Sequence, residues 1–285
     1  MVSRKDIYQQ TLSEIPPELF VQGDSLDSLL SVIIPESNKV ILFSDYHGDK
    51  FPVDLLLGSL PFLAHHGYNQ FMLEMLPMRD APYTSIDEIM TILTSSGWSS
   101  KPGEVKVIDS CHQLAVKCSE LGIEIIGGDI VNYAEMHRTG SIAPRYKMNE
   151  VIAERIAKNV REGKKVISFF GVEHNNTRTR NGHPSFDNHL GIPFYLGDVP
   201  YLVIKDVRMS NRTDYLTRLL PPGYVALKTE PVVDYPHFFI KVPTEDAVEA
   251  PSAKKQRPTS EGGRKRSIRK KRLKRKSKRY HGQIH

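Results

Sequence analysis

The sequence predicts an α/β fold: a mixed, largely parallel sheet flanked by helices, followed by a basic C-terminal tail. Short runs of apolar and β-branched residues alternate with longer segments whose apolar residues recur every three or four positions. This alternation is typical of right-handed β–α–β crossovers. No fixed-period repeat is present in the sequence, which disfavours solenoids and propellers.

The first predicted strand, helix and strand lie within residues 39–74. Residues 39–45 contain the run Val-Ile-Leu-Phe, which favours a strand buried on both faces. Pro52 suits the first turn of a helix and Gly67 suits its end, and residues 70–74 predict the next strand. We therefore expect a β–α–β unit here.

An insertion and a second helix–strand pair are expected next. Residues 76–108 are interpreted as an insertion that forms a lid or cap, with a short helix over residues 85–93. Asp109 is the expected N-cap of the following helix and Gly122 its end. Residues 123–129 predict the third strand.

The second half of the chain is expected to hold one more long helix and several strands. Pro144 suits the opening of that helix and Gly163 its end, and residues 165–170 predict the fourth strand. Further strands, some of them antiparallel, are expected at residues 192–196, 201–205, 224–228 and 237–242.

The charge of the chain divides it into a folded part and a tail. Residues 254–285 carry 15 of the 39 Lys and Arg residues and a single acid, so the remaining residues have a net charge of −8. The tail has almost no apolar residues and is expected to be disordered when free. We therefore expect one α/β domain over residues 1–250 and a disordered tail over residues 251–285.

The basic tail suggests a polyanionic partner. Its two clusters, residues 254–257 and 264–279, suit a nuclear import receptor, a nucleic acid or an anionic membrane surface. Because aromatic residues do not interleave with the charges, contact with nucleic acid would go through phosphates and would be salt-sensitive. The alternative is an extension that only increases solubility.

Cysteine spacing and hydropathy indicate the cellular compartment. Cys111 and Cys118 are too far apart along one helix for a disulfide, and both are expected to pack as small apolar residues. The N-terminal residues do not resemble a secretory signal, and no uncharged stretch is long enough to span a membrane. We expect a soluble protein that is cytoplasmic at synthesis, with export by a machine that reads no cleavable signal still open.

Titratable side chains follow four of the predicted strands. In parallel α/β sheets, ligands bind beyond the carboxyl ends of the strands, so these side chains should meet at one edge. That pattern predicts a functional site. The residues concerned are Asp45, His47, Asp49, Glu74, Asp129, Glu173 and His174.

Several of these residues also have a purely structural interpretation. His47 could cap a helix or bind a carbonyl, and Asp49 suits the N-cap of the helix that contains Pro52. Asp129 could equally be a turn residue after two glycines. Glu74 is the hardest to explain structurally, because an unpaired carboxylate in a buried strand costs several kcal/mol.

Five short motifs within residues 39–178 resemble a known superfamily. It unites haem-binding ChaN-like proteins, TraB/TIKI proteins and erythromycin esterases, and some bacterial toxin and secreted-effector domains are similar. The resemblance implies His47, Glu74 and His174 as the site and as metal ligands, with Arg145 as an accompanying cation. The motifs are Ser-Asp-Tyr-His47, Phe-Met-Leu-Glu-Met, Gly-Gly-Asp129, Arg145 to Asn149, and Ile-Ser-Phe-Phe-Gly-Val-Glu-His174.

The sequence departs from the superfamily pattern at two positions. Ser44 stands where the first Gly-x-x-His motif has glycine, and Asp45 stands where the esterases have glutamate. Asp45 stays a candidate catalytic residue, and Asp129 is a candidate for holding a cofactor.

These residue types predict hydrolysis of a small-molecule or peptide substrate. Two imidazoles and a carboxylate suit a divalent metal such as Mn, Zn or Fe, which would activate a water molecule. Without a metal, His47 would act as general base, oriented by Glu74 or Asp45, while Arg145 stabilises an oxyanion.

The alternative to hydrolysis is a non-catalytic module that binds haem, or an effector or toxin domain that acts by binding a host or cellular partner. Serine hydrolase, P-loop and dinucleotide motifs do not occur in the sequence.

Overall fold

The computed structural model describes residues 19–45, 49–95, 104–129, 148–172, 174–175, 191–207, 220–229 and 237–243. The chain divides into two compact units, Met1–Thr244 and Glu245–His285, and all the described residues belong to the first. The expected tail therefore lies outside the described residues. Within the described part, no helix is both long and apolar enough to cross a membrane.

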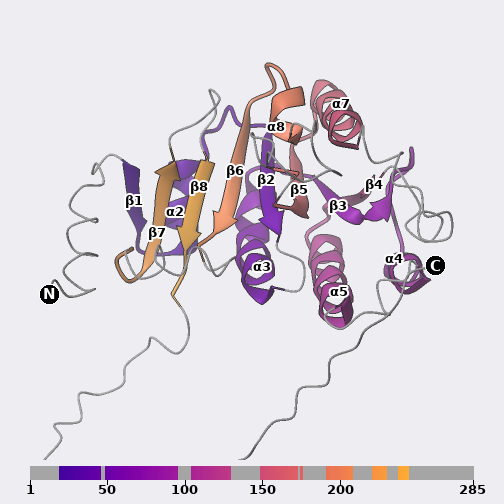
Figure 1. The fold of residues 1–285 in the computed structure, drawn as a ribbon, viewed down its shortest axis with the longest axis horizontal. Helices are drawn as coiled ribbons and strands as arrows, with labels where there is room; N and C mark the ends of the chain where they lie inside the picture. The colour runs from indigo at the N-terminus through magenta and orange to yellow at the C-terminus, as the bar shows by residue number, and fades with distance from the viewer. Residues whose placement is uncertain are drawn as a thin grey trace, which may run out of the picture. The chain divides into compact units, whose positions relative to one another are not determined.

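The first unit contains one eight-stranded sheet in the order β1-β7-β8-β6-β2-β5-β3-β4 (Figure 1). All neighbouring strands from β8 across to β4 pair in parallel, whereas β7 runs antiparallel to both β1 and β8. The predicted mixed, largely parallel sheet is confirmed. The strands are β1 (Phe20–Gly23), β2 (Val40–Asp45), β3 (Gln70–Pro77), β4 (Glu124–Asp129), β5 (Val166–Gly171), β6 (Tyr201–Asp206), β7 (Tyr224–Thr229) and β8 (His237–Lys241).

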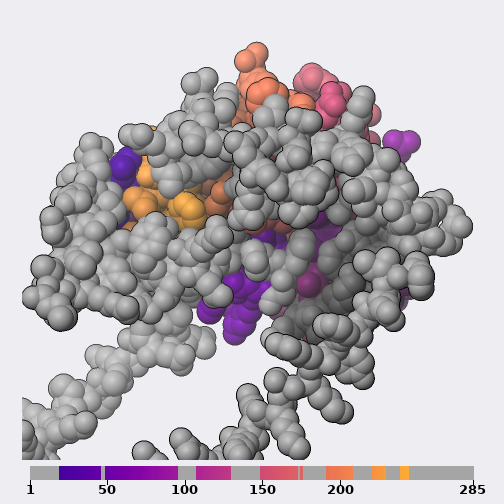
Figure 2. Space-filling view, in the orientation of Figure 1, coloured from indigo at the N-terminus to yellow at the C-terminus, as the bar shows by residue number. Residues whose placement is uncertain are grey.

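Helices cover both faces of this sheet, as the two main apolar clusters show. One face packs against α2 (Leu26–Ile33), α3 (Lys50–His65), α4 (Ile86–Ser95) and α5 (Glu104–Glu120). The other face packs against α7 (Met148–Arg161) and α8 (Ile192–Tyr195). In Figure 2 the residues of α7 and α8 reach the molecular surface along the upper rim.

The order of the strands explains this division. From β2 to β3 to β4 the chain moves along the sheet in one direction, and from β4 to β5 to β6 it moves back. Right-handed crossovers in opposite directions place their helices on opposite faces. The chain therefore leaves β3 toward one face of the sheet and leaves the neighbouring strand β5 toward the other face. In open α/β sheets, ligands bind beyond the carboxyl ends of two strands that are connected in this way.

Local sequence signals explain how the helix after β2 begins and ends. The carboxylate of Asp49 accepts a hydrogen bond from the backbone N–H of Phe51 at 3.2 Å and caps α3, as its position before Pro52 suggested. Gly67 follows the helix with φ of 81°, a left-handed conformation that favours glycine. The structural interpretation of Asp49 is thus confirmed.

Three expectations for individual elements were wrong or incomplete. Asp109 does not cap α5, which begins five residues earlier at Glu104 and includes Asp109 as an exposed residue. Residues 192–196 do not form a strand: residues 192–195 form α8, because Pro193 lies in a helical first turn and lacks the N–H that a sheet requires. The elements β1 and α2 were not expected at all.

The expected short helix in the insertion is confirmed as α4, although it begins and ends one or two residues later than expected. Its buried residues Ile89 and Leu93 belong to the same apolar cluster as α3 and α5. The helix is therefore part of the core on that face. Residues 96–103 of the insertion lie outside the described residues.

Candidate functional site

Glu74 reaches the carboxyl edge of the sheet through an irregularity in β3. Leu73 pairs with Gly127 and Pro77 pairs with Asp129, so β3 uses two more residues than β4 over this stretch. Such bulges re-aim side chains at the ends of strands. The side chain of Glu74 is only 4% exposed, and its Oε2 accepts a hydrogen bond from the backbone N–H of Gly171 at 2.6 Å.

His174 is brought to the same place by a tight turn after β5. Its backbone N–H donates to the carbonyl of Gly171 at 2.9 Å, and its carbonyl accepts from the N–H of Ile192 at 2.7 Å. The ring packs edge-on against Phe170, and its Nε2 lies 3.2 Å from Oε1 of Glu74. The predicted convergence of Glu74 and His174 is therefore present in the structure.

The turn that carries His174 is fixed to β2. The fully buried Asn175 donates from Nδ2 to the carbonyl of Phe43 at 3.0 Å and to Oγ of Ser44 at 3.2 Å. The backbone N–H of Val172 also donates to the carbonyl of Asp45 at 2.8 Å. These bonds hold the turn at the central strands of the sheet, so the position of the His174 ring is well defined.

Asn149 is a further site residue that the sequence did not single out. It lies in the first turn of α7, and its Oδ1 is 2.6 Å from Nδ1 of His174. The sequence contained Asn149 only as the end of a motif that begins at Arg145. The described site is a chain of contacts from the Gly171 N–H through Glu74 and His174 to Asn149, and it draws on β5, β3 and α7.

Nε2 of His174 and Oε1 of Glu74 lie so close that two lone pairs facing each other would repel. A proton or a cation between the two atoms removes this repulsion. An amide oxygen only accepts hydrogen bonds, so a proton on Nδ1 of His174 satisfies Oδ1 of Asn149. Nε2 is then the ring nitrogen that faces Glu74. A divalent cation held there would have Nε2 of His174 and Oε1 of Glu74 as two of its ligands.

Glu74 and His174 could serve as two ligands of a divalent metal, with the Gly171 N–H bonded to the other oxygen of Glu74 and Asn149 bonded to the other ring nitrogen of His174. Among the described residues, no group of three or more His, Cys, Asp or Glu side chains could hold a metal. The third expected ligand, His47, lies within residues 46–48, outside the described part of the chain. The same holds for Arg145 and Glu173, so the roles of these residues stay predictions.

The two glycines before Asp129 make room for the site. A Cβ atom on Gly128 would lie 2.4 Å from Cζ of Phe170 and 3.3 Å from Cα of Glu74. Asp129 itself is buried, and its carbonyl accepts a hydrogen bond from the N–H of Met78 at 2.6 Å. Asp129 ends the edge strand β4, beside β3, and its proposed part in holding a cofactor stays a prediction.

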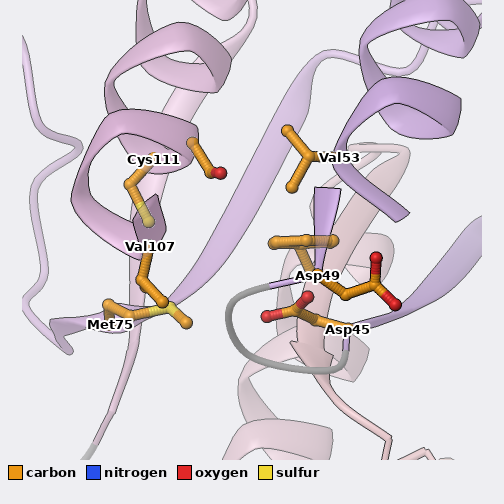
Figure 3. A pocket seen from close by; sticks show the side chains of 8 residues that line it. Asp45, Asp49, Val53, Met75, Val107 and Cys111 are labelled. Atoms are coloured by element: carbon orange, nitrogen blue, oxygen red, sulfur yellow. The ribbon is translucent and has the colours of Figure 1, made fainter. Parts of the chain in front are cut away.

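Asp45 ends β2 at the same edge, but it lines a recess on the other face of the sheet. The recess is small and lies between the ends of β2 and β3 and the helices α3 and α5 (Figure 3). Along β2, Phe43 and Asp45 face α3 and α5, whereas Leu42 and Ser44 face the opposite way. Besides Asp45, the lining includes Asp49, Val53, Met75, Val107 and Cys111.

The thiol of Cys111 in this recess is not suited to nucleophilic chemistry. Burial raises the pKa of Cys111 far above its usual range, and the charges of Asp45 and Glu74 raise it further. The thiolate is the reactive form of cysteine, so a raised pKa suppresses reactivity. Cys111 therefore packs as an apolar residue, as the sequence predicted.

Comparison with known proteins gives similarity at the level of solved structures only. No family model matches the sequence, and no curated protein matches it. The type III effector HopBA1 is 16% identical with a TM-score of 0.42, over 67% of this chain and 88% of HopBA1. RRSP, a MARTX toxin effector domain from Vibrio vulnificus, is 15% identical with a TM-score of 0.40, over 87% of this chain and 43% of RRSP.

A haem-binding protein is also among the similar structures. ChaN of Campylobacter jejuni, which binds haem cofacially, is 11% identical with a TM-score of 0.35, over 72% of this chain and 86% of ChaN. Effector and toxin domains and ChaN are therefore among the solved structures similar to this chain, at low identity.

Proposed function

We propose that this chain is a hydrolase whose site is the Glu74–His174 pair at the carboxyl edge of the sheet. The observation that carries the proposal is the 3.2 Å contact between Oε1 of Glu74 and Nε2 of His174. Each group is held from its other side, Glu74 by the Gly171 N–H and His174 by Asn149. A buried carboxylate and an imidazole fixed in this way are typical of a site that manages a proton or a metal-bound water.

We propose a metal-dependent form of this site in preference to a metal-free one. Both ring nitrogens of His174 are already engaged, so the ring has no nitrogen left to take a proton from water. With a divalent metal such as Mn, Zn or Fe bound, Glu74 and His174 would be its ligands, and the metal would supply an activated water. In the metal-free form the base must come from elsewhere, and His47 is the candidate that the sequence offers.

The test compares metal content and hydrolysis in matched variants. Glu74→Gln and His174→Gln remove the two proposed ligands with little change in size. Their controls are Glu120→Gln and His65→Gln, which change exposed residues at the ends of α5 and α3. Protein purified without chelator is assayed for metals by elemental analysis and for hydrolysis of ester, peptide and phosphoester substrates.

We expect metal near one equivalent in the wild type and both controls, and its loss in both site variants. Hydrolysis of at least one substrate class should fall by at least about 100-fold in the site variants, the usual scale for losing such a group. Wild-type activity that survives unchanged in Glu74→Gln and His174→Gln would show that the site has been misassigned. A wild type with neither metal nor activity would leave the non-catalytic effector, and a Soret absorbance band would favour haem binding.

We also propose that the basic segment of residues 254–285 binds a polyanion. The support is its composition, with 15 basic residues and one acid. Binding of the full chain to heparin should weaken steeply with salt and should be lost when residues 251–285 are deleted. Equal retention of both proteins on heparin would contradict this proposal.

A further inference from the structure

We infer that Asn149 is a positioning residue that keeps a proton on Nδ1 of His174 and so makes Nε2 the nitrogen that works with Glu74. The meaning of this inference for catalysis rests on the proposed function, but its evidence does not. The Oδ1 atom of Asn149 lies 2.6 Å from Nδ1 of His174. Because an amide oxygen has no proton to give, the proton of this short hydrogen bond belongs to the ring.

Asn149 is well placed to impose this arrangement, because α7 is firmly anchored beneath it. Met148, Ile152 and Ile156 of this helix are each no more than 1% exposed and pack into the apolar cluster on that face of the sheet. Asn149 follows Met148 directly, and its short side chain has few conformations that keep the contact. The ring of His174 is held on its own side by the turn after β5.

An amide suits this position better than a carboxylate because it adds no charge. The carboxylate of Glu74 already lies 3.2 Å from Nε2. With a neutral acceptor at Nδ1, the Nε2 side of the ring is left to Glu74 and to any cation that this carboxylate holds.

The test reads the protonation of Nδ1 directly. In protein labelled with ¹⁵N-histidine, the ring of His174 is identified by the signals that disappear in His174→Gln. The ¹⁵N shift of its Nδ1 is then measured at pH 7 without metal and with Zn²⁺, together with the Zn²⁺ dissociation constant. The variants are Asn149→Leu, which lacks the acceptor, and Asn149→Asp, which keeps it, with Glu154→Gln on the exposed side of α7 as control.

We expect a protonated Nδ1 in the wild type, in Asn149→Asp and in the control, both with and without Zn²⁺. Without Zn²⁺, the signal of Asn149→Leu should lose this character, and Zn²⁺ affinity should fall by about 10- to 100-fold, the usual effect of removing an outer-shell partner of a metal ligand. Retention of the signal in Asn149→Asp shows that the acceptor, and not the exact side chain, is responsible.

Two results would overturn the inference. One is an unprotonated Nδ1 in the wild type. The other is an Asn149→Leu protein whose Nδ1 shift matches the wild type and whose Zn²⁺ affinity stays within about twofold of it. A wild type that neither binds Zn²⁺ nor hydrolyses any substrate, but whose Nδ1 shift depends on Asn149, would refute the proposed function and leave the role of Asn149 intact.

Discussion

Replacing Gly127 by alanine should destabilise the protein strongly and disturb the site at a distance. A Cβ atom on Gly127 would lie 1.9 Å from the carbonyl oxygen of Pro77 and 2.7 Å from that of Leu76. Because both atoms belong to the backbone of the irregular end of β3, no side-chain rotation can relieve the clash. The carbonyl of Pro77 would have to move by about 1 Å, which is a large overpacking for a buried strand.

The magnitude follows from what that movement breaks. The hydroxyl of Tyr83 donates to the carbonyl of Pro77 at 2.7 Å, and the N–H of Met78 donates to the carbonyl of Asp129 at 2.6 Å. Losing these two hydrogen bonds costs about 1 kcal/mol each, and overpacking adds about 1 to 3 kcal/mol. We therefore expect Gly127→Ala to lower the free energy of unfolding by about 3 to 5 kcal/mol.

The assay is denaturant unfolding followed by circular dichroism, with Gly58→Ala as the matched control. Gly58 is exposed within α3, and a Cβ atom there meets only the end of the Leu26 side chain at 3.1 Å. Alanine in an exposed helix stabilises by up to about 1 kcal/mol relative to glycine, so this control should not lose stability. Equal unfolding free energies for the two variants would refute the reasoning. Because Glu74 lies in the displaced stretch of β3, the ¹⁵N signals of the His174 ring should also change in folded Gly127→Ala, and unchanged signals would likewise refute it.

Two further predictions follow from buried ionisable groups. Burial raises the pKa of Tyr68 to about 12 from 10.0, so as the pH rises this phenol ionises in the unfolded chain before it ionises in the folded one. The free energy of unfolding should therefore fall by up to about 3 kcal/mol between pH 10 and pH 12. Tyr68→Phe should remove that part of the slope in unfolding curves measured across this range, and an unchanged slope would contradict the burial argument. Burial also raises the pKa of Cys111, and it raises the pKa of Cys118 to about 12. Both thiols should therefore resist a disulfide reagent at pH 8 until the protein is unfolded. Reaction of either thiol in the folded protein would contradict this prediction.

The strands at the centre of the sheet could be predicted because their burial leaves a clear trace in the sequence. β2 and β5 are covered on both faces, so they contain uninterrupted apolar runs. β1 is too short for a periodic pattern to emerge, whereas α2 has apolar residues at helical spacing, Leu26, Leu29, Leu30 and Ile33, over only two turns. Ser25 and Ser28 form a reciprocal capping box at the start of α2, and this pair is the local signal that would have revealed the helix.

The convergence of Glu74 and His174 could be predicted because the carboxyl ends of parallel strands meet at one edge. The adjacency of their strands could not, since β5 inserts between β2 and β3, and this depends on pairing far apart in the chain. Asn149 was missed for the same kind of reason. Its part in the site depends on which face of the sheet α7 covers, and strand-end residues alone do not show that.

The alternation of side chains along a strand separates the expected acidic residues into two groups. Asp45 follows Phe43 at a spacing of two and lies with α3 and α5, whereas Glu74 follows Met72 at a spacing of two and lies with α7. One edge of the sheet thus presents a small acidic recess on one face and the Glu74–His174–Asn149 chain on the other. His47 comes between β2 and α3 in the sequence and lies outside the described residues, so its part in the site stays a prediction.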